Sequence, residues 1–248
     1  MKPVLIAGEI FPPPGSGLSS DAGFVNGAAT FIEALAAHDI RVRQVGAGRC
    51  EREFPGSTAA LDEFSAVVLS DVGALSLLLT AEARAGFPGV NRLEVLRQWV
   101  ELGGGLMMAG GYTSFQGMDG TARFHRTAVE DCLPVECLPY ADGLEAPEGL
   151  SPLVVDAAHP VVATLAGPWP KVLGVNMVRT RGDGSLLVAK CDYRGEAFPL
   201  LAVRNYGDGR TLAWTTDIGP HWLSRPFLDW PGYRTLATNM IRWVAREI

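Results

Sequence analysis

The chain has 248 residues, 48% hydrophobic and 19% charged, so it is long enough to bury one large core and is not a disordered chain. Its 21 Lys and Arg residues are outnumbered by 27 Asp and Glu residues. A net charge of −6 excludes the basic surface that grips a nucleic-acid backbone. No apolar run reaches the ~18 residues of a membrane-spanning helix. We therefore expect a cytoplasmic protein with no nucleic-acid or membrane partner.

The charged fraction and the cysteines bear on assembly and redox state. A charged fraction below the ~25% usual for globular domains favours a surface partly hidden between subunits, so we expect a homo-oligomer. Two of the cysteines, Cys132 and Cys137, lack the two-residue spacing of a zinc knuckle, and the others, Cys50 and Cys191, are widely separated. All four are expected to be reduced and buried. We expect a single domain over residues 1–248.

Strands and helices alternate in the first half of the chain. Unbroken apolar runs predict buried strands, and apolar residues at helical spacing predict helices between them. Such alternation favours a parallel, doubly wound sheet with right-handed crossovers. The predicted strands are 4–7, 41–45, 66–69 and 105–109, one helix starts near Phe24 with Ser20 or Asp21 as its cap, and a second spans 91–102 with Asn91 and Glu94 as a capping box and Gly103 after its end.

Beyond about residue 130 the pattern changes to short strands separated by glycine-containing turns. This sequence pattern predicts an antiparallel or mixed extension of the same sheet rather than a second hydrophobic core. Residues 206–210 predict a tight hairpin turn. The expected strands are 153–155, 186–190, 200–204 and 211–216, and a final amphipathic helix is expected over about 230–247.

Ligands of open parallel sheets bind at the carboxyl ends of the strands. This rule selects Glu9 after the first strand, Asp71 after the third and the segment 110–117 after the fourth. Two carboxylates at one edge repel, which raises at least one pKa and can create a general base. The alternative is that Glu9 and Asp71 only cap neighbouring helices or loops.

The segment 110–117 occupies the place of a nucleophile elbow, a sharp strand-to-helix turn that presents one side chain over backbone N–H groups. Counting from Gly110 and Gly111 puts Tyr112 at the elbow. A tyrosine with a pKa near ~10 is a poor acyl-transfer nucleophile. Ser114 is a second candidate nucleophile, although a capping hydroxyl explains it better. Phe115 completes the predicted ligand-binding loop.

A second cluster follows the predicted strand 211–216. Asp217, His221 and Trp222 place a carboxylate, an imidazole and an aromatic ring on one loop, which suits a ligand-binding edge or an acid–base pair. Packing of the histidine against its neighbours is the structural alternative. His159, in the turn 156–160, is expected to face the surface, and His125 could reach the same cleft.

A metal site built from Glu9, Asp71, Asp217 and His221 is a further hypothesis. It depends on proximity alone, because no pair of ligands has helical spacing such as two histidines four residues apart. We therefore assign no metal ligands and expect no cofactor.

Several segments together resemble the glutamine amidotransferase-like proteins of the class I glutamine amidotransferase-like superfamily, near the trehalose-utilisation-protein-like group. The resemblance covers nearly the whole chain and implies a flavodoxin-like three-layer α/β/α sandwich. It also implies that glutaminase activity needs an elbow cysteine with a downstream histidine and carboxylate, whereas this chain has Tyr112 there. We therefore expect no glutamine hydrolysis. The segments are Val4–Glu9, Val67–Asp71, Gly103–Phe115, Leu133–Val135, Asp156–Pro160, Tyr206–Arg210 and Asp217–Trp222.

Three functions are compatible with these residues. The first is a protein that binds a small polar, carbohydrate-related ligand. The second is an enzyme of unknown reaction that uses the candidate catalytic residues Glu9, Asp71, Asp217 and His221. The third is a structural assembly protein with a vestigial cleft. Replacing Asp217 and His221 discriminates the first two, since a binding protein loses only affinity and an enzyme loses turnover. The ligand-binding candidates are Gly110, Gly111, Tyr112, Ser114, Phe115 and Trp222.

Overall fold

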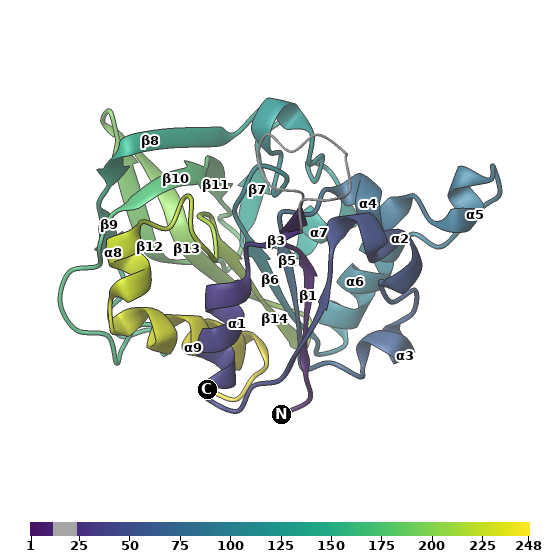
Figure 1. Cartoon of the computed structure of the whole chain (residues 1–248), viewed down its shortest axis with the longest axis horizontal. Helices are drawn as coiled ribbons and strands as arrows, with labels where there is room; N and C mark the ends of the chain where they lie inside the picture. The colour runs from purple at the N-terminus through teal and green to yellow at the C-terminus, as the bar shows by residue number, and fades with distance from the viewer. Residues whose placement is uncertain (12–23) are drawn as a thin grey trace.

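A computed structural model describes residues 1–11 and 24–248. At its centre lies one eight-stranded sheet of order β4-β1-β5-β6-β14-β13-β12-β9 (Figure 1). The first five strands are mutually parallel and the last three pair antiparallel, which confirms the predicted fold class. The strands are β1 Val4–Gly8, β4 Val42–Val45, β5 Ala66–Ser70, β6 Gly105–Ala109, β9 Pro152–Val154, β12 Leu186–Tyr193, β13 Glu196–Tyr206 and β14 Gly209–Trp214.

Helices cover both faces of the sheet (Figure 1). The longest, α9, packs with α1 on one face, and α6 lies on the other with the shorter helices of the first half of the chain. The α-helices are α1 Ala29–Ala36, α2 Cys50–Glu53, α3 Thr58–Leu61, α4 Ala74–Leu78, α5 Ala81–Arg84, α6 Arg92–Glu101, α7 Ala128–Cys132, α8 Arg225–Asp229 and α9 Gly232–Val244, and the 3₁₀ turns are η1 Ala47–Arg49 and η2 Met118–Gly120.

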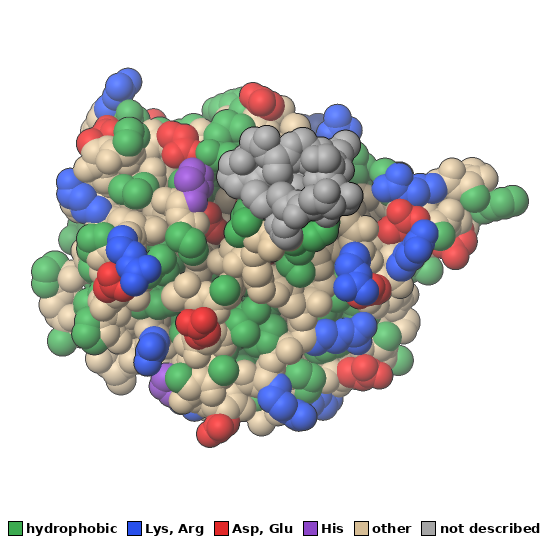
Figure 2. Space-filling view, in the orientation of Figure 1, with side chains coloured by type: hydrophobic (Ala, Val, Ile, Leu, Met, Phe, Trp, Pro, Cys, Tyr) green, Lys and Arg blue, Asp and Glu red, His purple; other side chains and the backbone are tan. Residues whose placement is uncertain are grey.

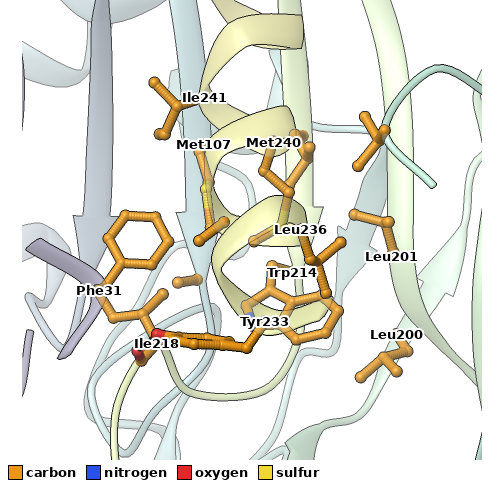
Figure 3. Packing of buried hydrophobic residues seen from close by; sticks show 14 of the residues in the cluster. Phe31, Met107, Leu200, Leu201, Trp214, Ile218, Tyr233, Leu236, Met240 and Ile241 are labelled. Carbon is orange, nitrogen blue, oxygen red and sulfur yellow. Dashed lines mark hydrogen bonds between the residues drawn. The ribbon is translucent and has the colours of Figure 1, made fainter. Parts of the chain in front are cut away.

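Alternation along the buried strands creates a core on each face. In β1, Val4 and Ile6 belong to the cluster under α1 and α9, whereas Leu5 and Ala7 belong to the cluster under α6. Successive strand residues point to opposite faces, so a fully apolar strand needs a helical layer on both sides. Figure 3 shows the first cluster, where Phe31 of α1 and Tyr233 of α9 meet side chains of the sheet.

Beside the main sheet, the described residues form three two-stranded pairs. The pairs are β2 Ile10–Phe11 with β3 Val25–Asn26, β7 Val135–Cys137 with β11 Val178–Thr180, and β8 Gly143–Leu150 with β10 Val172–Asn176. In the described ranges, no helix combines the length and the apolar composition needed to cross a membrane.

The helix predicted from Phe24 starts later, at Ala29. Residues 25–26 form β3 instead, and the N–H of Gly27 donates to the backbone oxygen of Glu9 at 2.9 Å. These pairings hold the segment extended before the first helical turn can form. Phe24 is 74% exposed, and the caps proposed at Ser20 and Asp21 lie outside the described residues.

Helix α6 was predicted almost to the residue. The Asn91 side chain accepts hydrogen bonds from the N–H groups of Leu93 and Glu94 at 3.1 and 3.2 Å, and Gly103 follows the helix with a φ of +115°, which suits glycine. The reciprocal half of the capping box is absent among the described contacts of Glu94, whose carboxylate binds Arg97 at 2.6 Å.

The predicted C-terminal helix corresponds to α9, which starts at Gly232 and ends at Val244. The short helix α8 lies before the predicted range and ends at Trp230 with extended backbone angles, as expected of a residue that precedes a proline.

His159 was predicted incorrectly, because only 7% of it is exposed and its ring lies 5.4 Å from that of Trp243. The turn before it packs against α9, which covers the imidazole.

Candidate functional site

Glu9 and Asp71 lie at the switch point of the sheet. The chain leaves β1 for β4 on one side and later returns to β5 on the other, which opens a crevice at the carboxyl ends of β1 and β5. Glu9 follows β1 and is only 2% exposed. Its Oε1 accepts a hydrogen bond of 2.5 Å from the hydroxyl of Ser70, the last residue of β5. The structure thus brings these predicted residues to one edge.

The loop after β6 carries Tyr112 to the same edge, but it is not a nucleophile elbow. After Gly111 the chain continues through turns to the 3₁₀ turn η2 rather than into an α-helix. The Asp71 carboxylate binds the N–H of Thr113 at 2.7 Å, and the N–H of Asp71 donates to the Ser114 hydroxyl at 3.0 Å. Ser114 therefore has a hydrogen bond to the backbone of the neighbouring loop.

Two buried residues that sequence reasoning missed hold this loop from below. The Asn176 amide oxygen accepts from the N–H of Gly111 at 3.0 Å, and its NH₂ donates to Asp142 Oδ1 at 2.8 Å. Asp142 also accepts from the N–H groups of Gln116 and Gly117, each at 2.8 Å. Both side chains are fully buried. Asn176 is the last residue of β10, and Asp142 directly precedes β8. No local sequence motif predicts that these two strands pair.

The loop after β14 brings Asp217 and His221 to the first two carboxylates. Asp217 is buried and His221 is half exposed, with 3.9 Å between His221 Nδ1 and Asp217 Oδ2. The backbone of this loop packs directly against the backbone of Gly27. A Cβ added at Gly219 would lie 1.9 Å from the carbonyl oxygen of Gly27. Glycine is required there by the close approach of the two chains.

Above the buried acids, Tyr112 joins the half-exposed acid–base groups. Its hydroxyl donates to Glu145 Oε1 at 2.8 Å and lies 3.2 Å from His221 Nε2. Since the tyrosine proton goes to Glu145, we assign the proton of the second contact to His221 Nε2, which then donates to the tyrosine oxygen. Trp222 donates its indole N–H to the same Glu145 oxygen at 2.9 Å.

These residues define the carboxyl-edge site: Glu9, Asp71, Tyr112, Glu145, Asp217 and His221. On the face drawn in Figure 2, acidic side chains lie near one of the two visible histidines. Glu145 comes from β8, the only one of the six on the added strand pairs, and no sequence signal distinguished it from other exposed glutamates.

Burial and crowding raise the pKa values of the carboxyl groups. Desolvation, followed by repulsion from Asp71, raises the pKa of Glu9 to about 7, although the Ser70 hydroxyl and Asp217 oppose the shift. Burial and the charges of Glu9 and Asp71 raise the pKa of Asp217 well above its ordinary value. The pKa values of Glu9 and Asp217 are linked, because the interaction between the two carboxyl groups lowers the pKa of Glu9 and raises that of Asp217.

Burial also raises the pKa of Tyr112 to about 12, with further contributions from the hydrogen bond to Glu145 and the charges of Asp71 and Asp217. The phenol consequently stays protonated at neutral pH and serves as a hydrogen-bond donor. This agrees with the expectation that Tyr112 is a poor nucleophile.

Three of the six residues have unusual backbone angles. Glu9, Asp71 and His221 have φ values of 59°, 46° and 108°, in the left-handed region that non-glycine residues seldom adopt. Such conformations cost about 1–3 kcal/mol each and concentrate at functional sites. The neighbouring Gly111 has no room for a side chain, because a Cβ would lie 2.4 Å from Asp71 Oδ1.

The remaining residues predicted for the site are buried within its loops or lie outside the carboxyl-edge site. Phe115 and Trp222 are fully buried, and Gly110 is sandwiched against the backbone of Thr215, so these residues shape the loops from inside. His125 does not reach this site: its Nδ1 lies 3.0 Å from the backbone oxygen of Cys137, and its ring lines a separate cavity.

The donors of a metal site are not assembled. Over residues 1–11 and 24–248, no group of three or more His, Cys, Asp or Glu side chains is arranged to hold a metal ion. All four cysteines are free and buried. Burial raises the pKa of the thiols of Cys50, Cys132 and Cys191 to about 12 and that of Cys137 well above its ordinary value.

Comparison with known proteins connects this architecture with a family. Residues 17–246 match the family described as "Putative glutamine amidotransferase". A solved cytoplasmic protein of Salmonella typhimurium is 30% identical, with a TM-score of 0.87 and 98% of each chain covered. A second, from Salmonella typhimurium LT2, is 28% identical, with a TM-score of 0.87, 97% of this chain and 98% of that chain covered.

A more distant structure extends the likeness in fold. A thua-like protein of Parabacteroides merdae is 16% identical, with a TM-score of 0.58, 98% of this chain and 89% of that chain covered. No curated protein matches the sequence.

Proposed function

Because this chain belongs to the glutamine amidotransferase-like family, with the sheet and crevice of that fold, we propose that it binds a small, hydroxyl-rich ligand of carbohydrate type at the carboxyl-edge site and does not hydrolyse glutamine. The observation that carries the proposal is the exposed Tyr112–Glu145–His221 array set above the buried Glu9–Asp217 pair. The likeness to two cytoplasmic proteins supports a cytoplasmic location, and the homo-oligomer stays a prediction.

The chemistry of the array selects the ligand. Carboxylate oxygens of Glu145 and Asp71 accept hydrogen bonds, whereas Tyr112 and His221 are the donors and would turn from their partners within the array to a bound ligand. An excess of negative charge at a half-buried edge disfavours an anion. A neutral molecule with several hydroxyl groups can donate hydrogen bonds to carboxylates and accept one from a phenol. The aromatic ring of Tyr112 also offers an apolar surface to a sugar ring.

The thiols argue against glutaminase chemistry. Formation of a glutamyl thioester requires a thiolate, but every cysteine is buried with a raised pKa. None lies in the segment 110–117. The position after β6 that the fold offers to a nucleophile is held by Tyr112, whose phenol keeps its proton.

The first test is ammonia release. We expect the purified protein to release no ammonia from glutamine above the rate of a heat-denatured sample, measured with a coupled dehydrogenase assay. An active glutaminase in the same buffer serves as the positive control. Ammonia release that survives replacement of all four cysteines would show that our account of the missing thiol is wrong.

The second test is sugar binding. We expect glucose, galactose or glucosamine to raise the melting temperature and to give a calorimetric isotherm. Tyr112→Phe and His221→Gln are each expected to weaken that binding roughly tenfold, since each removes one hydrogen bond to a polar ligand. The matched control is Tyr140→Phe, an exposed tyrosine (57%) outside the site. Equal affinities for the Tyr112 and Tyr140 variants, or no binding of any of these sugars, would contradict the proposal.

A second candidate function is acid–base catalysis on such a ligand. It is favoured by Glu9, whose pKa of about 7 matches that of a group that exchanges protons at neutral pH. Incubation with p-nitrophenyl glycosides tests this candidate. An enzyme would lose turnover in Asp217→Asn and His221→Gln while the wild type releases nitrophenol, whereas a binding protein would release none in any form.

A further inference from the structure

A second cavity lies away from the carboxyl-edge site. It has a volume of about 360 Å³ and is formed by β7, β11 and the turn before α7. None of the six residues of the carboxyl-edge site lines it. Its polar lining is dominated by three arginines and a histidine, namely Arg126, Arg179, Arg181 and His125.

Two of these guanidinium groups are exposed and have no acceptor among the residues that the structure describes. In the part of the chain that the structure describes, neither Arg126 nor Arg179 donates a side-chain hydrogen bond or forms an ion pair. Arg181 is fixed by a bond of 3.0 Å from Nη2 to the backbone oxygen of Glu130, and its buried Nε has no partner among the described residues. The exposed guanidinium groups of Arg126 and Arg179 are thus not committed to a protein acceptor among the described residues, and together with the buried Nε of Arg181 they are available to an anion.

The acidic residues of the cavity do not neutralise it. Glu130 is occupied by backbone donors, because Oε1 accepts from the N–H of Cys137 at 2.6 Å and Oε2 accepts from the N–H of Arg126. Glu136 is exposed, and its nearest contact with Arg181 is 4.0 Å. Three guanidinium groups therefore face two carboxylates, one of which is already hydrogen-bonded to the backbone.

A neighbouring cavity gives the site a second compartment. It has a volume of about 300 Å³ and shares Leu138 and Arg179 with the first. Its lining includes Tyr140, Met177 and Phe198. The first compartment thus presents cations, whereas the second combines apolar and aromatic side chains with the exposed carboxylate of Glu196, and Arg179 lines both compartments.

We propose that this pair of cavities binds a small organic anion, with its phosphate or carboxylate held by Arg126, Arg179 and Arg181 and its ring or chain in the compartment of Tyr140 and Phe198. Guanidinium groups bind such oxyanions through paired, charge-assisted hydrogen bonds. Phosphate and carboxylate share this chemistry, and the probes below separate them.

Isothermal titration of the full chain with phenyl phosphate, benzoate and inorganic phosphate tests the proposal. We expect at least one aryl anion to bind more tightly than inorganic phosphate, with an affinity that falls as salt is added. Tighter binding of phenyl phosphate identifies a phosphate-bearing ligand, and tighter binding of benzoate identifies a carboxylate. Arg126→Gln and Arg179→Gln are each expected to weaken binding tenfold or more.

The matched control is Arg123→Gln. Arg123 is exposed, lies three residues before Arg126 and shares its positive φ, but it does not line either cavity. The proposal fails if neither aryl anion binds the wild type, or if Arg126→Gln and Arg179→Gln bind like Arg123→Gln. Tyr112→Phe leaves this binding unchanged under the proposal, so a failure here is independent of the sugar-binding test.

Discussion

Replacing Glu9 with glutamine is expected to stabilise the protein at pH 8 by about 3 kcal/mol and to leave its stability at pH 4 nearly unchanged. Burial and the charge of Asp71 raise the folded-state pKa of Glu9 from its ordinary value of 4.5 to about 7. Each unit of difference between folded and unfolded states corresponds to about 1.4 kcal/mol. Glutamine resembles the protonated acid and keeps an oxygen for the Ser70 hydroxyl.

The sign of this effect follows from proton linkage. Below pH 4.5 both the folded and the unfolded states hold the Glu9 proton, so the group does not alter stability there. Between about pH 4.5 and 7 the unfolded state loses the proton first, and the free energy of unfolding of the wild type falls as the pH rises. Above about pH 7 the full cost of the buried charge is present, and Glu9→Gln removes it.

Thermal unfolding of both proteins from pH 4 to 8 measures this prediction. A difference of about 3 kcal/mol corresponds to a shift of the melting temperature on the order of 5–10 °C for a chain of this size. Glu148→Gln, at an exposed glutamate, is the control and should show no comparable change. A Glu9 variant that is less stable than the wild type at pH 8 would mean that the ionised carboxylate itself holds the site together.

Asn176→Ala is expected to destabilise the protein by about 3 kcal/mol or more. The fully buried amide satisfies the N–H of Gly111 and one oxygen of Asp142. Alanine leaves both groups buried without that partner, and an unpaired buried polar group costs about 1–3 kcal/mol, more when it is charged. Burial raises the pKa of Asp142, and the hydrogen bond from Asn176 opposes this shift by stabilising the ionised carboxylate. Since Asn176→Ala removes that stabilisation, the loss of unfolding free energy should be larger at pH 8 than at pH 4.

Denaturant titration of Asn176→Ala, with the exposed strand residue Asn205 replaced in a matched Asn205→Ala control, measures the effect. We also expect Asn176→Ala to lose sugar affinity, since the loop that carries Tyr112 loses its support from Asn176. Stability equal to that of the control would refute the supporting role of the amide.

The sequence by itself determined the sheet and the edge at which the acids gather. Unbroken apolar runs in β1, β5 and β6 can be satisfied only by burial on both faces, and parallel strands bring the residues after them to one edge. Glu9, Asp71 and Tyr112 were therefore placed correctly. The sequence left open whether Asp217 faces the same cleft, and it does so because β14 pairs parallel with β6.

Only the tertiary structure decided what completes and supports this edge. Glu145, Asp142 and Asn176 come from β8, β10 and the segment before them, whose pairing depends on long-range register that no local period encodes. His125 and His159 were misplaced for the same reason. The solvent exposure of a histidine depends on which helix or strand packs against the turn that carries it. That packing is determined by the tertiary structure of the whole core and not by the residues next to the histidine in the sequence.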